Sequence, residues 1–224
     1  MNQLPYISFV IPYYNSTRSV IEIYNELSFS INSISLKYEI IIIDDCSKNT
    51  NDTNENYNKE NLYCERLPYN RGQDYTTSYG ITKTNGDVII TFDDDLFYTN
   101  ELVSKILSEY INRRVDVLYC IRDYNEQHSP IRKFLQFFIK KTFYLLFRIR
   151  TSSIRVLNPT IKFQVLSNLE EEGLSLDKLI YTNNNKIEHL FIDIRSAGKS
   201  RYNIKRLATV FFNFLFYKKN NLYV

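Results

Sequence analysis

Short runs of aliphatic and β-branched residues, each bounded by polar or turn-forming residues, recur through the first half of the chain. Runs of this kind predict strands that are buried on both faces of a parallel sheet. A later run, Ile187–Ile194, alternates partly between apolar and polar positions and predicts one more strand. The other strands are expected at Tyr6–Ile11, which Pro12 ends, and at Glu39–Ile43, Leu62–Leu67, Val88–Phe92 and Asp116–Ile121.

Apolar residues at helical spacing separate these runs. Between Val20 and Ile31 they recur every three or four positions, which predicts a helix with Asn15 or Ser16 as its N-cap. Strands that alternate with helices predict an α/β fold, with a mostly parallel sheet flanked by helices. Further helices are expected over Asp74–Lys83, Glu101–Asn112 and Thr160–Glu171.

Polar clusters follow three of the predicted strands. Pro12-Tyr13-Tyr14-Asn15 follows the first strand, Asp44-Asp45 the second, and Asp93-Asp94-Asp95 the central strand. Ligands of open parallel sheets bind at the carboxyl ends of the strands, so we expect these clusters to converge on one site. Three adjacent carboxylates repel one another unless a cation lies among them, and their oxygens suit Mg²⁺ or Mn²⁺. The alternative is a solvated acidic turn that caps the next helix.

The composition is that of a folded protein. The 224 residues suit one α/β domain or a domain with a short appendage, and a hydrophobic content of 44% excludes wholesale disorder. Three cysteines without a CxxC pair favour free thiols in a reducing compartment. No signal peptide is expected, and no apolar stretch approaches the ~20 residues that span a bilayer.

Charge is distributed unevenly. Between Glu126 and Glu170 the chain has eight cations and no acid. Rings and aliphatic side chains fill most of 131–150 with cations among them, which is typical of a helix in a membrane interface. A core helix whose cations snorkel to solvent is the alternative. The eight cations are Arg132, Lys133, Lys140, Lys141, Arg148, Arg150, Arg155 and Lys162.

A cationic loop follows the last predicted strand. Its backbone N–H groups near Gly198, together with Arg195, Lys199 and Arg201, are suited to hold a phosphate. A final apolar helix is expected over Ile204–Tyr217.

Five motifs, in order along nearly the whole chain, resemble metal-dependent nucleotide-sugar glycosyltransferases of the GT-A fold. The resemblance is to the polyprenyl-phosphate branch, which includes dolichol-phosphate mannose synthase and bacterial undecaprenyl-phosphate sugar transferases. Five positions differ from the family pattern. Ser16 stands where the family often has Glu, Cys46 replaces a glycine, Phe97 replaces a glutamine, Ser153 replaces the acid of an Asp-Phe-Arg stretch, and Arg201 stands in for Lys. The motifs are Ile11–Asn15, Asp44–Ser47, Asn70–Gln73, the Asp-x-Asp-like Asp93–Leu96, and Arg195–Tyr202.

The resemblance implies a GT-A (Rossmann-like) fold with a nucleotide-sugar-binding core over 1–125. Residues 126–224 would form an acceptor-binding half with amphipathic interfacial helices. It also implies inverting transfer, in which Asp95, helped by Asp93, holds a metal that neutralises the leaving diphosphate. The donor is expected to contact Pro12, Tyr14, Asn15, Asp44, Asp45, Gln73 and Asp94. The acceptor is expected to contact Arg122, Arg132, Arg195, Ser200, Arg201 and Tyr202.

The chemistry of the acceptor favours a lipid phosphate. A sugar hydroxyl needs a carboxylate base, whereas a phosphate is already anionic, so the missing acid at Ser153 fits polyprenyl phosphate at the cytoplasmic face of a membrane. A hydroxyl of a lipid-linked saccharide is one alternative, and a non-catalytic nucleotide-binding homologue that docks to membranes is another. A nucleic-acid partner is not expected, because the aromatics alternate with aliphatics rather than forming stacking platforms. A homo-oligomer stays open.

Overall fold

The computed structural model describes residues 5–34, 36–48, 59–122, 151–170 and 175–193. These residues all belong to one compact unit that comprises residues 1–124 and 151–197. The segment 131–150, the loop Arg195–Tyr202 and the expected helix Ile204–Tyr217 lie outside the described residues. The division of the chain near residue 125 stays a prediction.

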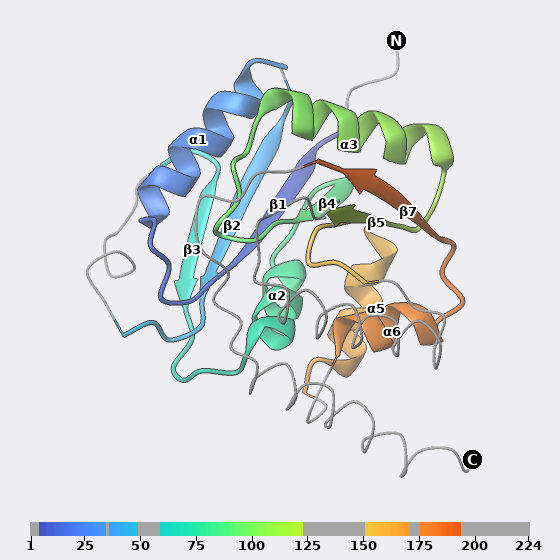
Figure 1. Ribbon diagram of the computed structural model, residues 1–224. Helices are drawn as coiled ribbons and strands as arrows, with labels where there is room; N and C mark the ends of the chain where they lie inside the picture. Colours follow the sequence, from blue (N-terminus) through green and yellow to red (C-terminus); the bar gives the residue numbers. More distant parts are fainter. Residues whose placement is uncertain (1–4, 35, 49–58, 123–150, 171–174, 194–224) are drawn as a thin grey trace, which may run out of the picture. The chain divides into compact units, whose positions relative to one another are not determined.

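The described residues form a seven-stranded sheet in the order β3-β2-β1-β4-β6-β5-β7 (Figure 1). Strand β6 runs antiparallel to both of its neighbours, and every other pairing is parallel. The predicted mostly parallel sheet is therefore confirmed. The strands are β1 (Ile7–Tyr13), β2 (Tyr38–Asp44), β3 (Leu62–Arg66), β4 (Val88–Thr91), β5 (Val117–Arg122), β6 (Arg155–Leu157) and β7 (Ile187–Ile192).

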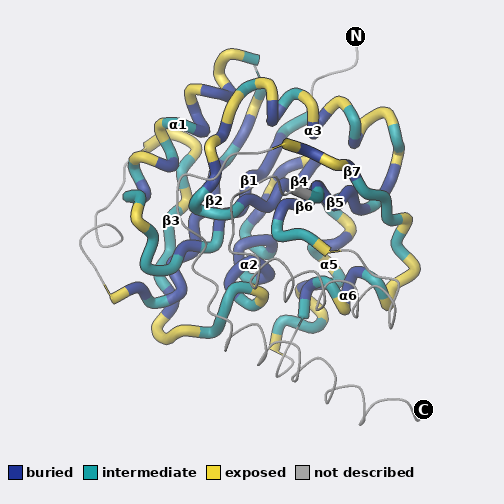
Figure 2. The backbone as a smooth tube through the Cα atoms, in the orientation of Figure 1, coloured by how far each residue is buried: buried dark blue, intermediate teal, exposed yellow. Residues whose placement is uncertain are grey.

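Helices cover both faces of the sheet. Helices α1 (Val20–Asn32) and α3 (Asn100–Arg113) pack on one face, and α2 (Gln73–Thr82), α5 (Thr160–Asn168) and α6 (Leu176–Thr182) on the other (Figure 1). Side chains alternate between the two faces: Ile40 and Ile42 of β2 join the α1–α3 core, and Ile41 and Ile43 join the opposite core. The central strands are buried, and the helices on either side of them carry exposed residues on their outer surfaces (Figure 2). No helix in this described part combines the length and apolar character needed to cross a bilayer.

Helix α2 packs unusually close to the sheet. A Cβ atom placed on Gly80 would lie 2.5 Å from Val10 Cγ1 and 3.2 Å from Ile43 Cγ1, so this approach requires glycine. The helix begins after Gly72, whose φ of 87° lies in the left-handed region. Gly72 and Gly80 therefore determine the position of Gln73, the first residue of α2, relative to the sheet.

The predicted end of the first strand was wrong. Strand β1 continues through Pro12 to Tyr13, and Pro12 is paired with Ile43 of β2. The pairing of β1 with β4 ends at Val10, whose carbonyl points toward β4. The backbone nitrogen of Pro12, two residues later, points to the same side, beyond the last paired residue. The strand therefore has an open edge where proline lacks its N–H group.

The predicted N-cap of α1 was wrong as well. Ser19, not Asn15 or Ser16, caps the helix, in a capping box with Glu22. Asn15 instead has a φ of 46° and links two loops of the site.

Strand β6 and helix α6 were not predicted, and a buried ion pair joins them. Arg155 donates from Nη2 at 2.8 Å and from Nε at 3.0 Å to Asp177 Oδ1, which also accepts from the Tyr119 hydroxyl. Arg155 is buried, and Lys162 donates to the carbonyl of Thr84. Arg155 and Lys162, two of the eight cations between Glu126 and Glu170, therefore stabilise the fold. The other six cations lie outside the described residues.

Candidate active site

The loops after β1 and β2 are bonded to each other at the carboxyl end of the sheet. The Asp45 N–H donates to the Tyr13 carbonyl at 2.8 Å. The Asn15 N–H donates to Ser47 Oγ at 2.8 Å, and the Lys48 N–H donates to Asn15 Oδ1 at 2.8 Å. The predicted convergence of the first two polar clusters is therefore seen. Pro12, Tyr14 and Asn15 are half-buried at this edge.

Asp44 is fully buried and holds the turn that follows β2. Its Oδ1 accepts from the Ser47 N–H at 2.9 Å and from Ser47 Oγ at 2.5 Å, and its Oδ2 accepts from Arg66 Nη1 at 3.0 Å. Arg66 Nη2 also donates to the Ser47 carbonyl at 2.7 Å. These bonds show that Asp44 fixes the conformation of the loop after β2.

Asp45 connects the same loop to the start of α2. Its carboxylate accepts from the N–H groups of Arg71 at 2.6 Å and Gly72 at 2.9 Å. Burial raises the pKa of Asp45, and the two N–H groups act in the opposite direction. A buried carboxylate that receives two backbone donors fixes the position of both loops.

The acidic turn (Asp93–Asp95) follows β4 and completes the edge. Asp93 Oδ1 accepts from Gln73 Nε2 at 3.2 Å, and its Oδ2 accepts from Ser153 Oγ at 2.5 Å. The three carboxylates are half-buried. The turn does not cap α3, because Thr99 does so by accepting from the Leu102 N–H at 3.2 Å. The structure therefore favours a role for the acidic turn other than helix capping.

The contact between Ser153 and Asp93 was not predicted from the sequence. Because β6 is antiparallel to β4, the start of β6 lies at the carboxyl end of β4, beside the acidic turn (the catalytic edge). There Thr91 Oγ1 donates to the Ser153 carbonyl at 2.6 Å. The sequence pattern did single out Ser153 as the position of a missing acid. The structure places that position directly against the first carboxylate of the acidic turn.

The acidic turn fits a metal that is shared with a substrate. The described residues contain no group of three or more His, Cys, Asp or Glu side chains able to enclose a metal ion. Mg²⁺ is commonly held by one or two carboxylates together with substrate phosphates and water. The carboxylate oxygens of Asp93 and Asp95 suit such shared binding of a metal. These two ligands therefore agree with a metal–diphosphate complex and not with a structural metal site.

The acceptor residues are only partly described. Arg122 is the last residue of β5, at the same end of the sheet as the acidic turn. The remaining candidates lie outside the described residues: Arg132, Arg195, Ser200, Arg201 and Tyr202.

Two further residues at this edge differ from the family pattern. Cys46 has a φ of 59°, in the left-handed region that suits the glycine it replaces. Phe97 is 46% exposed beside the acidic turn. All three cysteines, including Cys46, are free, as the sequence predicted.

Comparison with known proteins identifies the family. Residues 8–168 match the family model described as Glycosyl transferase family 2. Undecaprenyl-phosphate 4-deoxy-4-formamido-L-arabinose transferase from Pseudomonas fluorescens is 31% identical over 131 residues, which are 57% of this chain and 38% of that protein. The matched region therefore spans less than half of this curated relative.

Solved structures share the fold. The mannosyltransferase PcManGT from Pyrobaculum calidifontis, in complex with GDP-Man and Mn²⁺, superposes with a TM-score of 0.58 at 13% identity, over 89% of this chain and 59% of that one. Glucosyl-3-phosphoglycerate synthase from Mycobacterium tuberculosis, in complex with Mn²⁺ and UDP-glucose, gives a TM-score of 0.62 at 12% identity, over 94% and 77%.

These comparisons confirm the GT-A-type fold and the resemblance to the polyprenyl-phosphate branch that the motifs predicted. The family model covers most of the chain, including all residues of the acidic turn and of the loops after β1 and β2. The chain therefore belongs to glycosyl transferase family 2.

Proposed function

We propose that the chain is an inverting, metal-dependent glycosyltransferase that moves a sugar from a nucleotide-sugar donor to a polyprenyl phosphate at the cytoplasmic surface of a membrane. The observation that carries the choice of acceptor is the 2.5 Å contact between Ser153 Oγ and Asp93 Oδ2. Where the family pattern has an acid, this chain presents a hydroxyl to the acidic turn. The catalytic edge thus lacks one carboxylate base that a hydroxyl acceptor would need.

On the donor side, each described residue has a position suited to its role. A metal bound by Asp95 and Asp93 would neutralise the charge that develops on the diphosphate as it leaves. Gln73 orients Asp93 through its 3.2 Å hydrogen bond. Asp44 and Asp45 hold the loops whose residues Pro12, Tyr14 and Asn15 would surround the nucleotide. Asp94 would contact ribose or sugar hydroxyls.

On the acceptor side, an anionic phosphate needs cations beside a negatively charged donor. Arg122 is the last residue of β5 and lies at the same end of the sheet as the acidic turn. The residues that flank 123–150 lie next to each other, because β5 ends at Arg122 and Ser152 Oγ donates to the Cys120 carbonyl at 2.7 Å. The rings and cations in the sequence of 131–150 support peripheral contact with an anionic membrane.

The comparisons support the same proposal. The curated relative is named for transfer involving undecaprenyl phosphate, and the two structural neighbours were solved with a nucleotide sugar and Mn²⁺. We therefore propose Mn²⁺ or Mg²⁺ as the cofactor and a nucleotide sugar as the donor.

The test is a panel of UDP- and GDP-sugars with Mn²⁺ and vesicles that contain either undecaprenyl phosphate or a lipid-linked saccharide. We expect transfer to undecaprenyl phosphate and its loss, by at least about a hundredfold, in Asp95→Asn, because that change removes a charge that stabilises the leaving group. Asp87→Asn is the matched control: Asp87 accepts from the Tyr6 N–H at 2.9 Å at the opposite end of the sheet.

Each other outcome contradicts a stated part of the proposal. Transfer only to the lipid-linked saccharide would overturn the choice of acceptor. Full activity of Asp95→Asn would overturn the assigned metal ligand. Failure of every donor to be hydrolysed or transferred would favour a non-catalytic, nucleotide-binding homologue.

A further inference from the structure

The segment after the acidic turn is held on helix α1. Arg18, just before α1, donates from Nη1 to the carbonyl of Leu96 at 2.5 Å. The Tyr98 N–H donates to Glu26 Oε1 at 2.6 Å, and Ser30 Oγ donates to the Tyr98 carbonyl. Glu26 and Ser30 are four residues apart and so lie on the same face of α1. The backbone from Leu96 to Tyr98 is therefore bound along that face.

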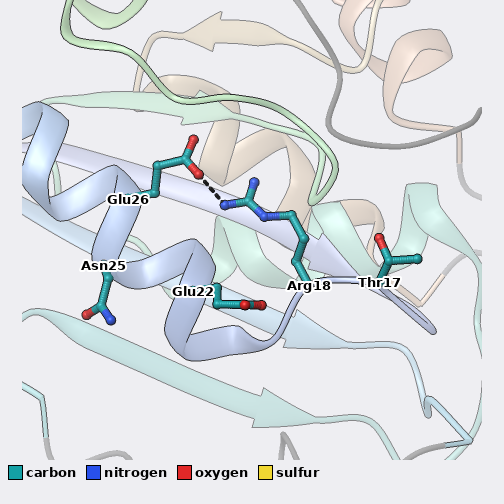
Figure 3. A pocket seen from close by; sticks show the side chains of 5 residues that line it. All are labelled: Thr17, Arg18, Glu22, Asn25 and Glu26. Atoms are coloured by element: carbon teal, nitrogen blue, oxygen red, sulfur yellow. Dashed lines mark hydrogen bonds and ion pairs between the residues drawn. The ribbon is translucent and has the colours of Figure 1, made fainter.

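A single guanidinium joins these contacts. Arg18 forms an ion pair with Glu26 (Figure 3), and its guanidinium carbon lies 5.5 Å from the centre of the Tyr98 ring. The side chains of Arg18 and Glu26 are 13% and 31% exposed, so both are largely shielded from water. The planar fork of the guanidinium reaches the Leu96 carbonyl with Nη1 and the Glu26 carboxylate with Nη2, a fixed geometry that the single ammonium nitrogen of lysine does not reproduce.

Tyr98 extends this contact to the acidic turn. Its hydroxyl donates to the carbonyl oxygen of Asp93 at 2.6 Å, and its ring packs on Phe92 with centres 5.4 Å apart. Tyr98 is buried, so this hydrogen bond is shielded from water. A continuous chain of contacts thus runs from α1 through Tyr98 to the backbone of Asp93.

We propose that Arg18 and Glu26 are positioning residues that hold the acidic turn in the geometry that binds the metal–diphosphate complex. This inference rests on the proposed function. Partners that orient metal ligands from outside typically change metal affinity by ~10–100-fold when they are removed. An ion pair that served only the fold would change the stability of the protein and leave metal affinity unchanged.

Two substitutions separate these roles. Arg18→Lys keeps the charge and removes the fork, whereas Glu26→Gln keeps an oxygen that can accept from Tyr98 and removes the ion pair. Arg113→Lys is the matched control, because Arg113 also joins two carboxylates, those of Glu109 and Glu188, and it does so from the end of α3.

The measurement is Mn²⁺ binding by calorimetry in the presence of UDP, and separately of GDP, with thermal melting of every variant. For Arg18→Lys and Glu26→Gln we expect Mn²⁺ affinity to fall on the order of tenfold. Binding of the same nucleotide without metal should stay unchanged, as should Mn²⁺ binding by Arg113→Lys. Should Arg18→Lys fail to fold, Glu26→Gln decides the question.

The outcomes distinguish the two proposals. Wild-type Mn²⁺ affinity in both Arg18→Lys and Glu26→Gln would overturn the positioning role and leave the proposed function intact. If the wild-type protein itself bound no Mn²⁺ with either nucleotide, the metal-dependent function would be overturned, and the positioning role with it.

Discussion

At the scale of single residues, Cys46 shows strain inside the donor loop. Its φ of 59° places it in a region where a side chain crowds the backbone at a cost of ~1–2 kcal/mol. Its sulfur accepts a hydrogen bond from Arg66 Nη2 at 3.7 Å and donates one to the Pro68 carbonyl at 3.8 Å. The neighbouring Asp44 and Asp45 are held by short hydrogen bonds, so the loop keeps this conformation in spite of the strain.

We predict that Cys46→Gly stabilises the protein. Relief of the left-handed strain exceeds the greater chain entropy of an unfolded glycine, which leaves a gain of about 0.5–1 kcal/mol in the free energy of unfolding. Urea titration of wild type, Cys46→Gly and Cys46→Ala measures this gain. Cys46→Ala removes the thiol and keeps the strain, so it should gain nothing. An equal gain in both variants would show that the thiol, not the backbone, is the unfavourable feature.

At the scale of elements, the shortest strand depends on a charge pair. Strand β6 has three residues, yet it joins β4 to β5 and places Ser153 at the catalytic edge. Arg155 of β6 is buried and bonded to Asp177 in the first turn of α6. Removal of one partner from such a pair leaves an uncompensated buried charge.

We therefore predict that Arg155→Met lowers the free energy of unfolding by about 3–5 kcal/mol. Arg113→Met, which breaks ion pairs that are about one-third exposed, should cost at most ~1 kcal/mol. Chemical denaturation of both variants measures the difference. A similar small loss in both would mean that water reaches Arg155 and that the pair does not anchor β6.

The pattern of apolar residues predicted the larger elements and missed the smaller ones. Six strands and four helices agree with their predicted positions to within a few residues, because most of them bury apolar residues in one of the two cores. Helix α2 differs, since it buries mainly Thr76, Thr77, Ser78 and Gly80. Strand β6 is too short to show a period. Helix α6 has only seven residues, although Leu176, Leu179 and Ile180 recur in it at helical spacing. The continuation of β1 through Pro12 depends on where a neighbouring strand ends, which local sequence does not encode.

The candidate site shows a similar division. The clusters at Asp44, Asp45 and the acidic turn were predicted because strand ends converge in such sheets. The roles within the clusters were not, since they depend on partners distant in sequence. Asp45 accepts hydrogen bonds from the N–H groups of Arg71 and Gly72. Asp93 accepts one from Ser153, and Arg18 donates one to the Leu96 carbonyl.

At the scale of the whole molecule, β5 and β6 form an antiparallel pair joined by a long connection. The Cys120 N–H donates to the Ile154 carbonyl at 2.9 Å, and Tyr119 is paired with Arg155. The two ends of residues 123–150 are thus already held side by side by the sheet.

We predict that replacement of residues 124–150 by a short Gly/Ser linker leaves the melting temperature and slow donor hydrolysis nearly unchanged, and abolishes both vesicle binding and transfer to undecaprenyl phosphate. Sedimentation with anionic vesicles and the two activity assays measure this on one preparation. The same length of scrambled sequence with Lys and Arg changed to Gln is the control for loop length. Retained transfer in the linker variant would remove this segment from acceptor binding.

The position of this connection also bears on how the family diversifies. Each doubling of a loop's length costs only ~0.6 kcal/mol of closure free energy. Changes in the length of the connection over 123–150 should therefore cost little closure free energy. A change at Asp45 or Gly72, in contrast, disturbs the start of α2. Under the proposed function, changes over 123–150 would alter the choice of acceptor while the loops proposed to hold the donor are inherited unchanged.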